Sequence, residues 1–270
     1  MSAPIALITG ANRTDGIGYA AARQLALQHG FTVVLGSRTL SPALDAAARQ
    51  LEKEGTKNGV HAVHIDVASS DSVRKAAKEV SEKFGKLDVL VNNAGLSVPP
   101  SRTEIVETWP QVSLDSTEHT RKDFEEVFAV NFFGIVDTIN VFAPLLAKSS
   151  SPRIVNVGSP AGSLDYISSL PANYLGASIV YSSSKAALHM LTIMYSKDLP
   201  KMNPAFKING GCPGFTDTSF NKHIGNRKPD EGAAVVTWLA TLPESGPTGG
   251  FYCDYPPYSE KNGEFKVLSW

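Results

Sequence analysis

Short, unbroken apolar runs alternate with longer stretches of helical periodicity along most of this sequence. Runs of this kind are typical of parallel strands covered on both faces, because such strands bury every side chain. The strands of a half-exposed sheet would instead alternate apolar and polar residues. The runs predict seven strands, at Ile5–Thr9, Thr32–Gly36, His61–Ile65, Leu87–Val91, Arg153–Val157, Phe206–Gly210 and Gly250–Cys253.

The stretches between these runs have the periodicity and the cap residues of helices. Ser41 stands before Pro42, and Ser69-Ser70-Asp71 opens another helical pattern. The predicted helices are Ile17–His29, Pro42–Glu54, Ser70–Phe84, Arg121–Ala147, Ile179–Leu199 and Asp230–Ala240. Repeated β-α-β units connect through right-handed crossovers. We therefore predict an α/β fold: a single-domain, doubly wound (Rossmann) parallel sheet of about seven strands with helices on both faces.

Composition excludes several classes of function. The chain has 270 residues, of which 42% are hydrophobic, enough for a sizeable core. The formal net charge of −1 gives no electrostatic reason to bind nucleic acid or an anionic membrane. The apolar runs are shorter than a membrane span, and the N-terminus has no basic region of a signal peptide. Cys212 and Cys253 fit neither a metal site nor a disulfide pattern, so we expect two buried thiols, no metal and a cytoplasmic protein.

A glycine-rich turn joins the first strand to the first helix. Glycines there let the backbone approach a pyrophosphate, which the N-terminus of the following helix favours. A glycine-rich turn alone is weak evidence, but this one has the required strand before it and helix after it. The residues that we expect at a dinucleotide are Gly10, Asn12, Arg13, Gly16, Ile17 and Gly18.

The second strand ends in Ser37 and Arg38, where an acidic residue would bind the ribose 2′-hydroxyl of NAD. A small hydroxyl residue followed by arginine suits the 2′-phosphate of NADP instead. Arg13, in the glycine-rich turn, can add a second positive charge. The alternative is that both arginines are simply solvated. Their position at the ends of the first two strands favours NADP(H) as the cofactor.

The other strands also end in polar or small residues. Asp66, followed by Val67, either contacts the adenine or caps the next helix. Asn131 is an amide within an apolar helix, so it is either a hydrogen-bonding hub or holds a water near the site. Ser159 can bond a substrate carbonyl or can be an ordinary turn serine. Further candidates at strand ends are Asn93, Ala94 and Gly95, which let backbone approach the cofactor, then Pro213 and Gly214, and finally Thr216 and Thr218, which could hold a carboxamide.

Tyr181 and Lys185 are four residues apart and lie one above the other on a helix face. An ammonium close to a phenol favours the phenolate and so lowers the pKa of the tyrosine. A tyrosine with a tuned pKa can act as a general acid or base. Alone, the spacing is more often a plain surface pair; the neighbouring motifs make it a candidate catalytic pair.

Taken together, these motifs resemble the short-chain dehydrogenase/reductase family, in the family's order and over nearly the whole chain. The C-terminal third looks most like the carbonyl reductase branch, through Pro229 to Ala233, Leu239 to Pro243, Gly246 to Tyr252 and Trp270. The resemblance implies four catalytic residues. Tyr181 would protonate the carbonyl oxygen, Ser159 would bond that oxygen, Lys185 would lower the pKa of the tyrosine and bind the nicotinamide ribose, and Asn131 would hold a relay water.

The sequence departs from the family pattern in three places. The glycine-rich turn is about two residues longer, through an insertion around Thr14-Asp15, a length otherwise seen in the enoyl-thioester reductases of the same superfamily. Tyr181 follows Ser159 by 22 positions, so the stretch between them can carry specificity residues such as Tyr166, Tyr174 and Leu175. The loop after the fourth strand is also extended.

These departures complete the predicted organisation. Residues 1–254 form the dinucleotide-binding domain with the active site, 96–120 and 161–178 are loop insertions, and 255–270 are a tail without a predicted structure. Long carbonyl reductases use a segment before the tyrosine to cover the surface where shorter members associate. A monomer is credible on this ground, and a dimer or tetramer stays open.

We therefore expect an NADPH-dependent carbonyl reductase that transfers hydride to a ketone, an aldehyde or a quinone-like small molecule. One alternative is an NAD(P)-dependent secondary alcohol dehydrogenase, which Ser37-Arg38 disfavours in its NAD form. The other is a non-catalytic NADP-binding scaffold, which has no need of the four catalytic residues.

Overall fold

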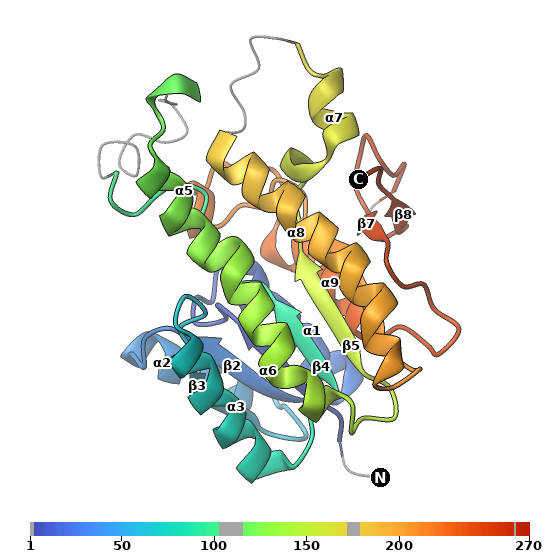
Figure 1. The fold of residues 1–270 in the computed structure, drawn as a ribbon. Helices are drawn as coiled ribbons and strands as arrows, with labels where there is room; N and C mark the ends of the chain where they lie inside the picture. The colour runs from blue at the N-terminus through green and yellow to red at the C-terminus, as the bar shows by residue number, and fades with distance from the viewer. Residues whose placement is uncertain (1–2, 103–115, 172–178, 262) are drawn as a thin grey trace.

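A computed structural model describes residues 3–102, 116–171, 179–261 and 263–270. These residues form one eight-stranded sheet with the strand order β3-β2-β1-β4-β5-β6-β7-β8 (Figure 1). Strands β1 to β7 pair in parallel, and β8 pairs with β7 in the antiparallel direction. This is the predicted α/β fold, with one strand more than expected. Tyr174 and Leu175 lie outside the described residues.

The strands form where the apolar runs predict them, because their side chains are buried on both faces of the sheet. All residues of β1, β2, β4, β5 and β7 are buried. The predicted runs agree with the observed strands to within two residues at each end. The strands are β1 Ile5–Thr9, β2 Thr32–Ser37, β3 Val60–His64, β4 Val89–Asn92, β5 Arg153–Val157, β6 Lys207–Gly211, β7 Phe251–Cys253 and β8 Lys266–Val267.

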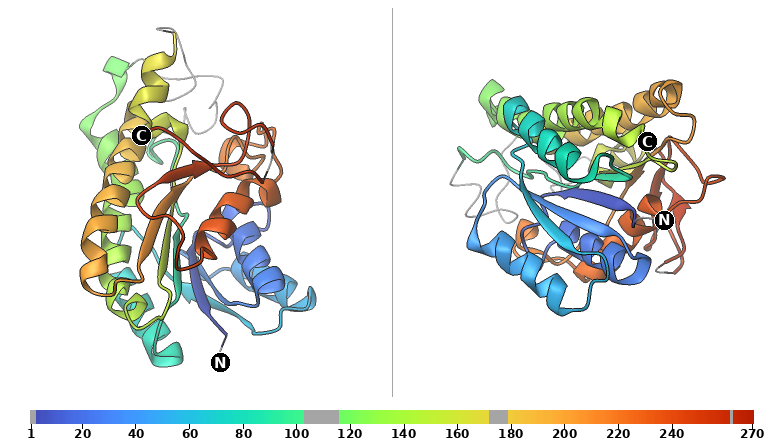
Figure 2. Two further views of the ribbon diagram at one scale, coloured as in Figure 1. Left: turned by 90° about the vertical axis from the view of Figure 1, so that its right-hand side faces the viewer. Right: turned by 90° about the horizontal axis from the view of Figure 1, so that it is seen from below.

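Helices cover both faces of the sheet and make three layers (Figure 2). On one face α1, α2 and α9 pack in one apolar cluster, and on the other face α3, α6 and α8 pack in a second cluster. The helices are α1 Ile17–His29, α2 Pro42–Lys53, α3 Ser70–Phe84, α5 Arg121–Phe128, α6 Gly134–Leu146, α7 Leu164–Ser169, α8 Ile179–Asp198 and α9 Pro229–Ala240.

Apart from short 3-10 turns, three elements of the described residues were not predicted from the sequence. The helix expected over Arg121–Ala147 is divided by a π-helical turn, η2, at Ala129–Phe133. The short helix α7 lies in the stretch expected to be irregular, where Ser163 caps it by accepting a hydrogen bond from Tyr166 N. Strand β8 lies in the tail, where apolar Leu268 joins a small cluster with Phe251 and Cys253.

The segment Arg121–Leu146 is long and apolar enough to cross a membrane by length and composition alone. Half of its apolar window is buried inside the protein, where residues of α6 such as Ile139 and Phe142 pack under the sheet. Its composition therefore matches that of a helix that covers one face of a sheet.

The parallel strands deliver their loops to one edge of the sheet. The order reverses between β1 and β4, because β1 continues to β2 on one side and the chain returns to β4 on the other. Ligands of open α/β sheets bind at the carboxyl edge beside such a reversal. The loops after β1 to β6 all reach this edge and carry most of the candidate site residues. Asn131 lies in η2, and Tyr181 and Lys185 lie on α8.

The aromatic side chains of the long helical segment offer a test of the core. Phe142 is 0% exposed, whereas Phe133 is 58% exposed. We expect Phe142→Ala to lower the free energy of unfolding by about 3–5 kcal/mol, because a buried phenylalanine leaves a cavity. Phe133→Ala should cost about 1 kcal/mol or less. Urea denaturation of the two variants measures the difference, and equal losses would contradict this placement.

Candidate active site

The glycine-rich turn approaches the end of β4 closely. Gly10 has a left-handed φ of 68°, and a Cβ added to it would lie 3.0 Å from Ala94 Cα. Asn93 fixes the turn, since its Nδ2 donates to the carbonyl oxygens of Thr9, at 2.8 Å, and Gly10, at 3.2 Å. The turn therefore has no room for a side chain at Gly10, beside which Ala94 lies.

The N-terminus of α1 is suited to bind a phosphate group. Gly16 caps this helix without a side-chain hydrogen bond, and its first turn contains no acidic residue. By contrast, the first turn of α3 contains Asp71, and Ser69 caps that helix through its side chain. Helix α1, which begins with Ile17 and Gly18, thus leaves its N-terminal N–H groups and their positive potential for an anion. A dinucleotide fits this cradle of glycines.

The end of β2 carries a free cation. Ser37 is buried and accepts a hydrogen bond from Thr39 N, whereas Arg38 is exposed. Within the described residues the guanidinium of Arg38 has no hydrogen-bond or ionic partner. Arg13 lies elsewhere: its Nη1 donates to Ser219 Oγ, at 2.8 Å, in the loop after β6. Of the two arginines, Arg38 is thus the one whose guanidinium has no partner among the described residues.

Asp66 lies in the turn that leads to α3, but Ser69 caps this helix, so the capping role expected as one alternative for Asp66 is not found. Its Oδ1 accepts a hydrogen bond from Ala68 N at 3.1 Å. Val67 is buried and packs closely against Gly134: a Cβ added to Gly134 would lie 2.7 Å from the carbonyl oxygen of Val67. Asp66 remains at the carboxyl end of β3, on the same edge as the glycine-rich turn.

Asn131 is a hydrogen-bonding hub. Its Oδ1 accepts from Leu96 N at 2.8 Å, and its Nδ2 donates to Leu96 O, at 2.8 Å, and to Ser184 Oγ, at 3.0 Å. The π-helical turn η2 contains Asn131, and such turns are frequent at functional sites. Gly95 lies beside it, because an added Cβ would be 3.4 Å from Asn131 Oδ1 and 3.9 Å from Lys185 Nζ.

Tyr181, Lys185 and Ser159 come together as predicted. The hydroxyl of Tyr181 is hydrogen-bonded to the side chain of Ser159. Lys185 is buried, its Nζ donates to Val157 O at 2.9 Å, and it lies 5.7 Å from the centre of the Tyr181 ring. The turn η3, Pro160–Gly162, packs directly on α8, since a Cβ added to Gly162 would be 2.5 Å from the carbonyl carbon of Lys185.

Burial governs the protonation of this pair. It raises the pKa of Tyr181 to about 12, although the hydrogen bond from Ser159 acts in the opposite direction. Burial also lowers the pKa of Lys185 to about 8. The expected lowering of the tyrosine pKa by the ammonium is therefore wrong for this structure: desolvation of the phenolate is the largest cause of the shift, and Lys185 is not among its causes. At neutral pH Tyr181 is a neutral phenol and can donate a proton.

The loop after β6 folds on itself beside the site. Gly214 has a φ of 73°, and Thr216 Oγ1 donates to Pro213 O at 3.0 Å. Thr218 forms a capping box with Asn221 over the turn η5, Ser219–Asn221. Both threonine hydroxyls thus help to shape the loop, and both threonines are buried.

Comparison with known proteins identifies the fold family. The family model described as short chain dehydrogenase matches residues 4–229. The chain belongs to the short-chain dehydrogenase/reductase family. It is an oxidoreductase of that family, and the resemblance inferred from the motifs is confirmed.

Three proteins illustrate the similarity. Salutaridine reductase of Papaver bracteatum is 31% identical over 92% of this chain and 93% of its own. The structure of salutaridine reductase from Papaver somniferum has a TM-score of 0.72 and 28% identity over 92% of this chain and 99% of that one. An alcohol dehydrogenase from the archaeon Thermococcus sibiricus, complexed with 5-hydroxy-NADP, has a TM-score of 0.70 and 29% identity over 92% of this chain and 94% of that one.

Hydrogen bonds between buried polar side chains connect the strands β4 and β5 to the helices α6 and α8. Asn92 Nδ2 donates to Asn156 Oδ1 at 2.9 Å, which ties β4 to β5. Thr138 of α6 donates to Asn92 Oδ1, and Asn156 donates to Thr192 of α8. The two threonines were not predicted from the sequence. Their signal was a hydroxyl residue within an apolar helical face.

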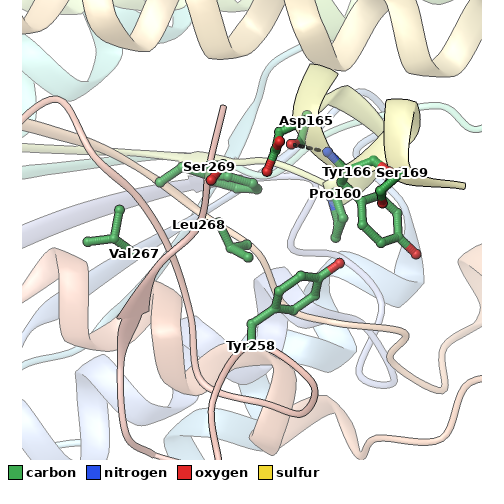
Figure 3. A pocket seen from close by; sticks show the side chains of 10 residues that line it. Pro160, Asp165, Tyr166, Ser169, Tyr258, Val267, Leu268 and Ser269 are labelled. Carbon is green, nitrogen blue, oxygen red and sulfur yellow. Dashed lines mark hydrogen bonds between the residues drawn. The ribbon is translucent and has the colours of Figure 1, made fainter.

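A cavity of about 260 Å³ lies between helix α7 and the C-terminal segment (Figure 3). Pro160, Tyr166, Tyr258 and Leu268 line it, together with Asp165. The rings of Tyr166 and Tyr258 meet edge to face at 5.9 Å. Residues of helix α7, in the insertion before Tyr181, and of the C-terminal segment line this cavity together. The turn after Ser159 contributes Pro160 to the same lining.

His189, one turn after Lys185 on α8, makes stability depend on pH. It is buried, and burial together with the nearby Lys185 ammonium lowers its pKa from 6.5 to about 3. Below about pH 6.5 the imidazole of His189 gains a proton in the unfolded chain, whereas in the folded chain it stays neutral down to about pH 3. The free energy of unfolding therefore falls by about 1.4 kcal/mol per pH unit on acidification through this interval.

We expect His189→Leu to reduce this acid sensitivity between pH 6 and pH 4, measured by urea denaturation at each pH. His29→Leu is the matched control, since His29 is exposed and should leave the slope unchanged. Identical slopes for wild type and His189→Leu would contradict a neutral buried imidazole.

Proposed function

We propose that this protein is an NADPH-dependent carbonyl reductase that transfers hydride to a ketone, an aldehyde or a quinone-like substrate. The observation that carries the proposal is the neutral Tyr181 phenol, hydrogen-bonded to Ser159 beside the Lys185 ammonium. A phenol held protonated at working pH is the form that a carbonyl reduction needs as its acid.

A bound nicotinamide cofactor supplies the hydride, which no side chain can provide. The Tyr181 hydroxyl donates its proton to the substrate oxygen as negative charge develops there. Ser159 donates a second hydrogen bond to the same oxygen and so stabilises that charge. Lys185 supplies positive potential beneath the tyrosine, and with a pKa of about 8 it can exchange a proton near neutral pH. Asn131 holds α8 and the loop after β4 at a fixed separation.

The preference for NADP(H) over NAD(H) rests on Arg38. Its exposed guanidinium follows Ser37 directly at the end of β2, where a ribose phosphate would lie. The alcohol dehydrogenase with 5-hydroxy-NADP supports an NADP-type cofactor for this fold.

Oxidation of a secondary alcohol is the second candidate, because the same relative is an alcohol dehydrogenase. That direction uses Tyr181 as a base, and by microscopic reversibility the same residues catalyse both directions, so the raised pKa does not choose between them. The names of the salutaridine reductases favour reduction. A non-catalytic scaffold would need none of this arrangement. We therefore assign reduction, in a soluble cytoplasmic protein that acts on a small molecule.

The aromatic residues beside the Ser159 turn favour a ring-containing carbonyl compound as the substrate class. Tyr166, on the insertion before Tyr181, contributes an aromatic ring beside the Ser159 turn. The test is to add cyclic and open-chain carbonyl compounds one at a time and to measure the oxidation of NADPH by the loss of its absorbance. Faster oxidation with the cyclic compounds would support this substrate class.

Tyr181→Phe should reduce kcat by about 10²–10⁴-fold, because it removes the general acid and leaves the ring in place. NADPH binding, measured by calorimetry, should change little. Tyr195→Phe is the matched control: Tyr195 is also on α8, and its hydroxyl bonds Asn140 at the surface. Near-native turnover of Tyr181→Phe would refute the assignment.

Arg38→Ala should weaken NADPH binding about tenfold or more, because a charge-assisted bond to phosphate is lost, and should leave NADH binding nearly unchanged. Arg49→Ala, an exposed arginine on the neighbouring helix α2, provides the control. Calorimetric titration with both nucleotides measures the effect. Equal weakening for NADPH and NADH would refute the role in binding the 2′-phosphate.

A further inference from the structure

The extra residues of the glycine-rich turn make contact with the loop after β6. Ser219 N donates to Asp15 Oδ2 at 3.0 Å, and Arg13 Nη1 donates to Ser219 Oγ at 2.8 Å. These two bonds join segments that are more than 200 residues apart in the sequence. The insertion around Thr14-Asp15 therefore has a specific structural partner.

His223 adds a second connection. Its Nε2 lies 3.4 Å from Asp15 Oδ2, and its Nδ1 is hydrogen-bonded to Asp217 Oδ1 at 2.9 Å. Lys222 and His223 have φ values of 54° and 59°, in the left-handed region that disfavours residues other than glycine. Such a conformation persists only where surrounding contacts hold it. We call the contacts of Arg13 and Asp15 with Ser219 and His223 the clasp.

The clasp spans the carboxyl edge of the sheet beside the cofactor cradle. In the sheet β1 and β6 are separated by β4 and β5, which corresponds to three strand spacings, or about 14 Å. The loop after β6 is closed at its base, where Asp217 N donates to Arg227 O at 2.7 Å and Asn226 N donates to Phe215 O at 2.8 Å. The clasp thus fixes a pre-folded loop against the turn that leads into α1.

We propose that Asp15 is a positioning residue for the cofactor: through the clasp it holds the loop after β6 over the diphosphate and slows dissociation of the nucleotide. This inference rests on the proposed binding of NADP(H). The ligand region concerned is the diphosphate, because Asp15 of the clasp directly precedes Gly16, the N-cap of α1.

A competing role for Asp15 has the opposite sign. A carboxylate beside the N-terminus of α1 would repel a phosphate if it were free. Here Asp15 accepts a backbone hydrogen bond and lies beside an imidazole, and its side chain is 37% exposed. Loss of a contact weakens binding of the nucleotide, whereas loss of a repelling charge strengthens it. A single variant therefore distinguishes the two roles.

The experiment measures NADPH dissociation from wild type and Asp15→Ala by stopped-flow fluorescence, with affinities from calorimetry. We expect dissociation to be about tenfold faster in Asp15→Ala, the size of effect of one hydrogen bond to a charged group. Thr14→Ala, in the same insertion, should keep the wild-type rate. His223→Asn, which tolerates the left-handed backbone, should give a smaller acceleration, since exposed ion pairs contribute little.

Hydrogen exchange of residues 215–227 without nucleotide provides a second readout. It should quicken in Asp15→Ala and stay unchanged in Thr14→Ala, which separates loosening of the loop from misfolding of the whole chain. An unchanged or slower NADPH dissociation in Asp15→Ala would refute the proposed role of the clasp in retaining the nucleotide, while the proposed function of the protein would stand. Failure of the wild type to bind any nicotinamide nucleotide would overturn both proposals.

Discussion

The side-chain amide of Asn131 is the contact on which the geometry of the candidate site depends. It pairs with both backbone groups of Leu96 and donates to Ser184, whose hydroxyl in turn donates to the carbonyl oxygen of Tyr181. A buried amide with all these partners resists displacement, because any shift leaves a polar group unsatisfied. The separation of the β4 loop from α8 is fixed in this way, and with it the position of Tyr181 and Lys185.

The buried position of the pair has an electrostatic consequence. Burial disfavours the charged form of both groups, so it raises the pKa of Tyr181 and lowers that of Lys185. The bond from Lys185 Nζ to Val157 O compensates part of the cost of a buried ammonium. The neutral phenol and the compensated cation are therefore properties of the same packing between β5 and α8.

Much of this fold could be read from the sequence because parallel strands bury both faces and leave unbroken apolar runs. The site residues at strand ends followed from the same rule: once β4 and β5 were located, Asn93 and Ser159 had to reach one edge. The π-helical turn at Asn131 could not be predicted, since an apolar helical pattern hides one extra residue per turn. The pKa of Tyr181 was also misjudged, because spacing reveals a neighbouring charge and not the amount of water that packing removes.

Strand β8 has a consequence for how the protein behaves in a crowded solution. A parallel sheet that ended at β7 would present a buried apolar strand with unpaired backbone groups, on which a strand of another chain could be added. The two residues of β8 cover that strand in the antiparallel direction, and both are exposed. The new edge is only two residues long and carries the charge of Lys266, features that discourage edge-to-edge aggregation. The tail that the sequence left without a structure thus protects the sheet from uncontrolled growth.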